Sequence, residues 1–408
     1  INGTSVKELL KPYTVSNDDK DVMPVMNETN GLKLIDVRGL DYDDEAYTKL
    51  LNQLTEQDYA NAGKYLINGA YNTPMMENVD KPATEDHDGP QGFSSLMGKF
   101  ENVTAYMSEP LLAATFNKEL GKKMGTAIGE EALSFGGTFS GWYGPAMNTH
   151  RSPFAGRNFE YYSEDGVLAG KIAAEVVSGA ADKGLYAYIK HFALNDQETF
   201  RTTCLCTWAS EQTIREIYLK PFEIVVKTAK TKIDYISDDK GNHTQKEMNA
   251  CTAVMSSFNR IGTTWAGGSK NLMTNVLRDE WGFRGFALSD FNLYDYMYSD
   301  QGMRAGTDMQ LTWLKSDSMP FGKSTFTDLD SATARQAIRK AYHNVFYTVA
   351  NSNAMQDIAP GTIISYKTSG WRILLYIVDA VLLTFVVLGT VWVCIRVLVL
   401  SKKKKEQE

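Results

Sequence analysis

A short apolar run that ends in a carboxylate constrains the fold of this chain more than any other feature. Residues 286–288 are apolar and are followed at once by Ser289 and Asp290. Before them, residues 271–278 carry apolar side chains at helical spacing, and Gly282 is placed to end that helix. In a barrel of parallel strands, the carboxyl end of each strand faces the active site. Asp290 is therefore either a catalytic carboxylate or the cap of a following helix.

The same pattern recurs along the chain. Residues 252–259 form a second apolar run that ends in polar and aromatic residues, and residues 184–189 form a strand-like run that ends in Lys190 and His191. Because an unpaired ammonium is costly to bury, this pair is expected to have partners at a strand end, where both side chains can enter a cavity. Alternating helices and strands of this kind favour an α/β fold.

Length and charge narrow the class of protein. A chain of 408 residues is long enough for one barrel of roughly 250 residues with additional segments. The net charge is −7 and the basic tract lies at the extreme carboxyl end, which argues against nucleic acid as the main partner. An acidic chain with 21 Tyr and 7 Trp suits neutral sugars better.

Cysteine usage is sparse and shows no metal-ligand spacing. Cys204, Cys206 and Cys251 lie in the globular part and Cys394 lies in an apolar tail, so no dense disulfide framework is expected. A bridge from Cys204 or Cys206 to Cys251 and a buried free thiol are the two alternatives. No metal ion or organic cofactor is implied.

The carboxyl end predicts a membrane anchor. Residues 373–395 are almost wholly apolar, with Asp379 as their only charge, and residues 402–405 are all lysine. About 20 apolar residues suffice to cross a bilayer, and a flanking lysine run marks the cytoplasmic side. A buried core helix, the alternative, would not explain the lysines. Asp379 is expected near the outer interface, where its carboxylate reaches water.

Several separated motifs resemble, in their order, the barrel domain of glycoside hydrolase family 3, the exo-acting β-glucosidases and their relatives. The resemblance extends from about Asp43 to about Met355. Each motif alone is weakly specific, whereas their shared order is highly specific. The motifs are residues 88–92, 156–160, 190–192, 215–219, 254–259 and 289–291.

The resemblance and the composition of the two ends together predict the domain organisation. The fold class is α/β, a (β/α)8 TIM-like barrel plus one carboxyl-terminal transmembrane helix. The chain begins without Met and without a signal-peptide pattern, which indicates a fragment or a processed product. The expected segments are a linker at 1–44, the barrel at 45–355, a juxtamembrane linker at 356–371, the transmembrane helix at 372–400 and a cytoplasmic basic tail at 401–408.

The resemblance also implies roles for individual residues. It makes Asp290 the nucleophile, and the chemistry agrees, because a glycosidase needs carboxylates and cationic donors around one small pocket. Asp88, in a Gly-Pro turn, can accept two hydrogen bonds from adjacent sugar hydroxyls. Glu160, three residues after Arg157, is expected to hold that guanidinium and not the sugar. The residues expected to position the terminal sugar are Asp88, Arg157, Lys190, His191 and Arg201.

Two aromatic positions depart from the family pattern. Phe258 stands where many members carry a Tyr whose hydroxyl approaches the nucleophile, so that hydrogen bond is lost. Phe291 stands where many relatives have Trp, which keeps an apolar stacking face. Met255 either lines the pocket wall beside Phe258 or packs in the core.

The motifs do not supply the general acid/base. Retaining hydrolysis needs a second carboxyl group roughly 5 Å from the nucleophile. In the β-glucosidase branch a separate α/β sandwich domain supplies that Glu, and we expect a rearranged member whose sandwich precedes the barrel, outside these residues. Glu198 and Glu211 are the candidates on this chain, although an i,i+4 pair with Arg215 accounts for Glu211. Residues 193–198 lack the Gly-His-Gly loop of another branch.

The sequence thus predicts an exo-acting retaining β-glycosidase that hydrolyses terminal non-reducing β-D-glycosyl residues. Its expected partners are a β-linked oligosaccharide or glycoside substrate and the lipid bilayer, with a single pass through the cell membrane, the barrel outside and the carboxyl terminus in the cytoplasm. The alternative is a membrane-displayed sugar-binding or interaction protein that kept the pocket and lost turnover. Sugar and linkage specificity depend on variable loops such as 234–247.

Overall fold

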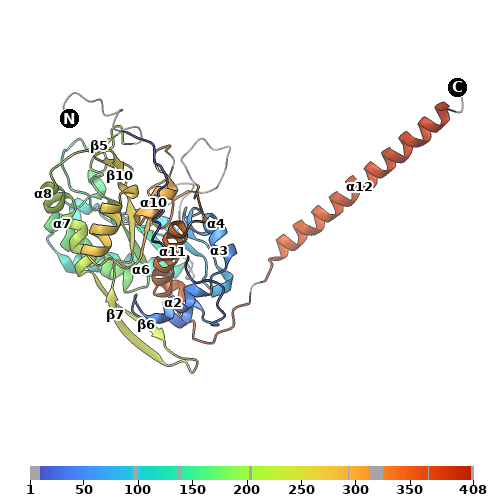
Figure 1. Cartoon of the computed structure of the whole chain (residues 1–408). Coiled ribbons are helices and arrows are strands. Elements are labelled where there is room, and N and C mark those ends of the chain that lie inside the picture. Colours follow the sequence, from blue (N-terminus) through green and yellow to red (C-terminus); the bar gives the residue numbers. More distant parts are fainter. Residues whose placement is uncertain are drawn as a thin grey trace. The chain divides into compact units, whose positions relative to one another are not determined.

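The computed structural model describes residues 10–94, 100, 102–135, 139–201, 205–292, 294–312, 325–365 and 367–405. The chain divides into two compact units, Ile1–Thr362 and Ile363–Glu408. The first unit is globular, and the second contains one long helix, α12 (Gly370–Lys405), as Figure 1 shows.

A six-stranded sheet forms the centre of the globular unit. The first strand is antiparallel to the second, and every other neighbouring pair is parallel. The strands follow the chain order across the sheet, as expected for βαβ connections. In sheet order they are β1 (Asn72–Thr73), β2 (Thr84–Asp88), β3 (Phe139–Tyr143), β4 (Tyr186–Phe192), β8 (Ala253–Ser256) and β11 (Phe286–Leu288).

An irregular segment continues the sheet beyond β11. Met309 N donates to Ala287 O at 3.0 Å, and Gln310 N donates to Leu66 O at 2.8 Å. Because residues 66–70 lead into β1, these hydrogen bonds return to the first strand and close the sheet on itself. The expected α/β class is therefore confirmed. The sheet is less regular than predicted, since its parallel strands in the described part of the chain are β2, β3, β4, β8 and β11, fewer than eight.

Helices cover the outer face of the sheet, and glycines let two of them approach closely. A Cβ on Gly125 of α6 would lie 1.9 Å from Val176 O of α7, and one on Gly179 would lie 2.2 Å from Lys122 O. Glycine is therefore required at this contact. The main outer helices are α6 (Lys118–Ser134), α7 (Gly166–Ala181), α9 (Lys220–Thr228), the π-helix η6 (Asn271–Glu280) and α11 (Ala332–Ala350).

The remaining elements lie in the connections. A three-stranded sheet and a two-stranded hairpin stand apart from the central sheet, and Figure 1 places the hairpin at the edge opposite β5 and β10. The small sheet contains β5 (Cys206–Thr207), β9 (Arg260–Ile261) and β10 (Thr264–Trp265), and the hairpin contains β6 (Lys230–Ile236) and β7 (His243–Asn249). The short helices are η1 (Leu34–Val37), α2 (Glu45–Asn52), α3 (Glu56–Ala60), α4 (Ala62–Leu66), η2 (Glu77–Val79), α5 (Glu109–Ala114), η3 (Asn158–Glu160), α8 (Glu211–Thr213), η4 (Ile214–Tyr218), η5 (Ala266–Gly268), α10 (Ser299–Ala305) and η7 (Asn353–Met355).

The interior of the sheet holds a buried polar network below the strand ends. Asp86 accepts hydrogen bonds from the hydroxyls of Tyr186, at 2.6 Å, and Tyr188. Burial raises the pKa of Asp86 to about 6. Lys81, also buried, donates to Thr73 Oγ1 at 2.8 Å, and burial lowers its pKa to about 7. Polar groups in this interior are satisfied by one another, as buried polar groups must be.

A buried ion pair ties β11 to the helices around it. Asp308 Oδ2 accepts hydrogen bonds from Arg278 Nη2, at 2.6 Å, and from Ala287 N, at 2.7 Å. Asp308 Oδ1 accepts a hydrogen bond from Asn344 Nδ2 at 2.8 Å. The side chains of Arg278 and Asp308 are each only 3% exposed. One carboxylate thus joins η6, β11 and α11.

The second unit is described by itself. Residues 370–403 of α12 form the one helix in the described part of the chain that is long and apolar enough to cross a membrane. Its apolar side chains are exposed along its whole length, and Asp379 lies in its amino-terminal third. These features agree with the predicted anchor.

Replacing Asp308 with Asn would leave the Arg278 guanidinium buried without its counter-charge. We expect the free energy of unfolding of the globular unit to fall by about 3–5 kcal/mol, the usual effect of breaking a buried ion pair. Urea unfolding of the full chain in detergent, followed by tryptophan fluorescence, measures this change. Glu280→Gln is the control, because it breaks the exposed pair with Arg215 (2.7 Å) and should cost less than about 1 kcal/mol. Equal losses in the two variants would contradict the role given to Asp308.

Candidate active site

The carboxyl ends of three parallel strands bring the predicted residues together. Asp88 is the last residue of β2, and Lys190 and His191 lie near the end of β4. Asp290 follows β11 by two residues. Because parallel strands end at the same edge of the sheet, side chains more than 200 positions apart in sequence meet there. We call this edge the mouth of the site.

Asp88 and Lys190 form a direct ion pair at this mouth. Lys190 Nζ donates to Asp88 Oδ1 at 2.8 Å, and Gly89 N donates to the same oxygen at 2.8 Å. Burial by itself would raise the pKa of Asp88, but the Lys190 ammonium holds it below its ordinary value. The Lys190 side chain is buried, whereas that of Asp88 is 44% exposed. Asp88 is therefore ionised and open to a ligand.

Asp290 presents one oxygen that no described atom satisfies. Its Oδ1 accepts a hydrogen bond from Phe291 N at 2.7 Å, while its buried Oδ2 has no hydrogen-bond partner in the described part of the chain. His191 Nε2 lies 3.8 Å from Oδ2. The helix that follows, α10, begins at Ser299 with Tyr298 at its N-cap position, so the capping alternative for Asp290 is wrong.

The charges around Asp290 oppose the effect of its burial. Burial raises the pKa of Asp290, and the positive charges of Arg157, Arg201 and Lys190 counteract the rise. Burial also lowers the pKa of His191 well below its usual value, and the same three cations lower it further. His191 is therefore neutral at physiological pH and serves as a hydrogen-bonding group, not as a counter-charge.

The backbone around His191 is held by a residue that the sequence did not reveal. His191 N donates to Asn148 Oδ1 at 2.8 Å, and Asn148 Nδ2 donates back to His191 O at 2.9 Å. Tyr161, whose hydroxyl donates to Asn195 O at 2.9 Å, lies 3.5 Å from His191 Nδ1. Neither Asn148 nor Tyr161 lies in a motif that the sequence analysis singled out, although Tyr161 directly follows residues 156–160.

The two predicted arginines are each held by a glutamate three residues away. Arg157 Nε donates to the buried Glu160, so the expectation that Glu160 holds the guanidinium is confirmed. Arg201 Nε lies 3.1 Å from Glu198 Oε2, and the buried Arg201 Nη1 has no hydrogen-bond partner in the described part of the chain. Each guanidinium is thus positioned by a neighbouring carboxylate.

An aromatic wall stands beside Arg201. The guanidinium lies over the Phe258 ring, 4.5 Å from its centre. The Tyr296 hydroxyl donates to Phe258 O at 3.0 Å and to Arg201 O at 3.2 Å. Phe291 packs against the cluster that contains Phe258. Tyr296 was missed by sequence reasoning, because nothing in its neighbourhood distinguishes it from other loop tyrosines.

The structure also bears on the predictions for Met255, Glu211 and the cysteines. Met255 is buried in the inner core cluster, which favours core packing over a pocket wall. Glu211 is 79% exposed and pairs with Arg215 Nε at 2.9 Å, as an i,i+4 partner would. Cys251 is a buried free thiol, so a bridge from Cys206 to Cys251 is wrong, and Cys204 lies outside the described residues.

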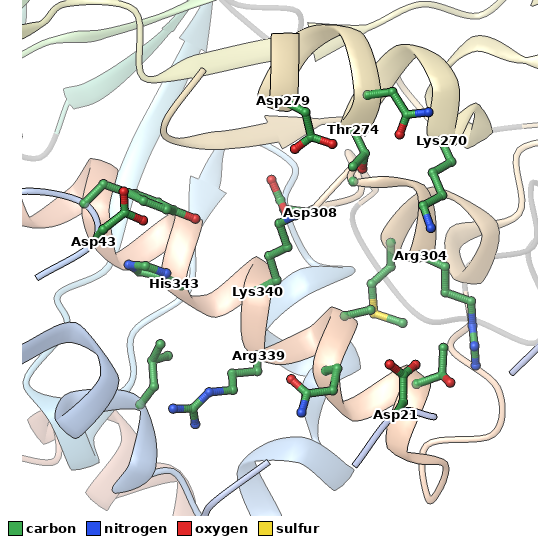
Figure 2. A pocket seen from close by; sticks show the side chains of 18 of the residues that line it. Asp21, Asp43, Lys270, Thr274, Asp279, Arg304, Asp308, Arg339, Lys340 and His343 are labelled. Carbon is green, nitrogen blue, oxygen red and sulfur yellow. The ribbon is translucent and has the colours of Figure 1, made fainter. Parts of the chain in front are cut away.

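Cavity size does not identify this site. A cavity of about 440 Å³ is lined by Asp88, Arg157 and Lys190 together with residues 89–94. A larger cavity, about 800 Å³, is lined by none of the predicted sugar residues (Figure 2). Figure 2 shows acidic and basic side chains facing the same space there, including Asp43, Asp279, Asp308, Lys270, Arg304, Arg339 and Lys340.

Comparisons with known proteins agree with this geometry. Residues 70–237 match the glycosyl hydrolase family 3 N terminal domain. The chain is 38% identical over 236 residues to Beta-glucosidase A of Butyrivibrio fibrisolvens, covering 58% of this chain and 25% of that protein. It is 35% identical over 283 residues to Beta-glucosidase B of Emericella nidulans, covering 68% of this chain and 30% of that protein.

A solved structure gives the same result. Beta-glucosidase 3B from Thermotoga neapolitana, in complex with α-D-glucose, is 29% identical with a TM-score of 0.60, covering 76% of this chain and 43% of that chain. The resemblance found in the motifs is thus confirmed, with the family model matching residues 70–237. It spans about a quarter to a third of the length of the two curated relatives.

The charge balance at Asp290 predicts a pH effect. Removing the Arg201 cation should raise the pKa of Asp290 further, so the carboxylate should become reactive only at higher pH than in the wild type. Labelling of Asp290 by a cyclitol epoxide, followed by peptide mass spectrometry across a pH series, measures the midpoint in Arg201→Met. Arg151→Met is the control, because that guanidinium lies over Tyr218 and should leave the midpoint in place. A midpoint that stays or falls in Arg201→Met would refute this electrostatic role.

Proposed function

We propose that this chain is the nucleophile-bearing part of an exo-acting retaining β-glycosidase that removes terminal β-D-glycosyl residues. The observation that carries the proposal is Asp290, a buried carboxylate at a strand end with one unsatisfied oxygen. The relatives support it, since the proteins named above are β-glucosidases. They give no support to the alternative of a sugar-binding protein without turnover.

The residues at the mouth would divide the work of binding the sugar. The exposed Asp88 carboxylate, held by Lys190, would accept hydrogen bonds from two adjacent hydroxyls. The neutral His191 would hydrogen bond to a neighbouring hydroxyl. Arg157 and Arg201 would keep Asp290 ionised and fix the edge of the ring, and Phe258 and Phe291 would supply apolar contact.

The reaction would proceed in two displacements. Asp290 Oδ2 would attack the anomeric carbon and form a glycosyl ester, while the bond to the leaving oxygen breaks and that oxygen takes a proton. Water would then attack the same carbon, lose a proton to a base and release the ester, which regenerates the carboxylate. Both steps need a second carboxyl group that first gives and then takes the proton.

Two glutamates beside the site are engaged with its arginines. Glu160 is ion-paired with Arg157 and Glu198 with Arg201, so both carboxylates already position a guanidinium group. We therefore propose that the acid/base Glu comes from an α/β sandwich domain outside these residues. Residues 10–13 and Tyr296 line the same cavity. This placement supports a sandwich domain joined to the barrel near the mouth.

Replacing Asp290 with Asn should prevent formation of the glycosyl-enzyme and leave the fold intact. An amide oxygen is too weak a nucleophile to replace the carboxylate. The wild type, treated with a slow 2-fluoro β-glucoside, should carry a glycosyl label on the peptide that contains Asp290, and Asp290→Asn should carry none. Glu211→Gln, a change at an exposed helical carboxylate, should be labelled as the wild type is. A label on any other carboxylate would overturn the proposal.

We further propose that α12 anchors the protein in the cell membrane, with the globular unit outside and the lysine run in the cytoplasm. At 1.5 Å per residue, the 34 residues of the apolar helix exceed the roughly 30 Å hydrocarbon core. The excess lets both ends reach the interfaces. Trp371 near one end and Arg396 near the other are residue types found at such boundaries.

Deleting residues 371–408 should convert a membrane-bound protein into a soluble one with the globular unit unchanged. Burial of about 20 apolar residues in lipid far outweighs the cost of Asp379 near an interface. Sedimentation after a high-salt wash measures the change. The control deletes only residues 402–408 and should remain in the membrane fraction. If the longer deletion still sediments with membranes, α12 is not the anchor.

A further inference from the structure

A second cavity lies beside the candidate active site, between the amino-terminal segment and the loop that follows Asp290. Its volume is about 550 Å³, within the range of ligand-binding clefts. The proposed sugar-binding residues do not line it. Its walls are formed by Leu10, Lys11, Pro12, Tyr13, Arg260, Thr263, Thr264, Trp265, Asp295, Tyr296, Tyr298 and Gln301.

Tyr296 belongs to both spaces. Its hydroxyl donates to the backbone oxygens of Arg201 and Phe258, which stand at the candidate active site. Its ring lines the cavity and lies under the Arg260 guanidinium, 3.8 Å from its centre. The loop that begins at Asp290 therefore also lines this cavity, through Asp295 and Tyr296.

Aromatic rings in the cavity are held in place by buried partners. The rings of Tyr13 and Tyr298 lie 5.7 Å apart at an angle of 43° and form a corner. The Tyr13 hydroxyl donates to Asp300 Oδ2 at 2.8 Å, and the buried Asp300 is itself paired with Arg304 Nε at 3.0 Å. Trp265 Nε1 donates to Ser257 O at 2.8 Å. These rings are preorganised, so a ligand would not need to order them.

The polar lining complements the rings. Asp295 and Thr264 are exposed, and Thr263 and Gln301 are half-buried, so hydroxyl, amide and carboxylate groups face the same space as the aromatic corner. A pyranose presents an apolar C–H face and a rim of hydroxyls. Flat rings match its face, and mixed donors and acceptors match its rim.

We infer that this cavity is an accessory subsite that binds a pyranose unit on the leaving-group side of a β-linked oligosaccharide. The inference rests on the proposed function, because in an exo-acting enzyme only the terminal sugar enters the catalytic pocket and all other units belong to the leaving group. Tyr13 and Tyr298 supply the stacking faces. The amino-terminal segment thereby contributes to selection of longer substrates over simple glucosides.

The test compares a β-1,4-linked glucose trisaccharide with glucose. Binding of each to the full chain in detergent is measured by calorimetry. We expect Tyr13→Ala to weaken trisaccharide binding about 5- to 10-fold, the effect of losing roughly 1 kcal/mol or slightly more. Glucose binding and fluoroglucoside labelling of Asp290 should not change. Tyr13→Phe keeps the ring and should bind the trisaccharide nearly as the wild type does.

The outcomes separate this inference from the proposed function. Absence of a label on Asp290 in the wild type would refute the glycosidase proposal itself. Normal labelling with equal trisaccharide affinity in the wild type and Tyr13→Ala would overturn the subsite alone. If Tyr13→Ala also weakens labelling, trisaccharide binding to Tyr298→Ala tests the subsite, because that variant keeps the hydrogen bond from Tyr13 to Asp300. Selective loss of trisaccharide binding in that variant supports the subsite, and unchanged binding overturns it.

Discussion

The position of Asp290 depends on the hydrogen bonds that hold residues 308–311 against β11. Asp308 accepts a hydrogen bond from Ala287 N within the strand, and Ser289 and Asn292 donate from their backbone nitrogens to Met309 O and Leu311 O, each at 2.9 Å. The residues on both sides of Asp290 are thus fixed by one segment. Arg278 of η6 and Asn344 of α11 hold Asp308 in turn. The packing of these outer helices therefore also fixes the position of Asp290.

Electrostatic balance is the second constraint on the mouth. Three cations and two aspartates meet there in a largely buried space, and an unpaired charge would be costly in such surroundings. Glu160 and Glu198 each neutralise one guanidinium, and Lys190 pairs with Asp88. Asp290 Oδ2 and Glu198 Oε1 are both buried without a hydrogen-bond partner in the described part of the chain. Glu198 is ion-paired with Arg201, whereas Asp290 Oδ2 has the neutral His191 at 3.8 Å.

In the proposed function, the loop after Asp290 would connect the catalytic pocket to the neighbouring cavity. The Tyr296 hydroxyl donates to the backbone oxygens of Arg201 and Phe258 at the mouth, and the Tyr296 ring lines the neighbouring cavity. A change in that cavity would act on the reactive centre through these backbone contacts. The amino-terminal segment, which reaches this loop through Tyr13, extends the recognition surface beyond the barrel strands.

The sequence by itself determined the strand ends, the family motifs and the apolar carboxyl-terminal segment. Asp88, Lys190, His191 and Asp290 could be placed at one mouth because period and motif are local properties, and parallel strands share one edge. Only the tertiary structure decided the closure of the sheet through residues 309–311, the free state of the buried Cys251, and the place of Tyr296, which contacts Arg201 across 95 positions. Such contacts join segments that are distant in sequence, and local sequence patterns do not indicate which distant groups will meet.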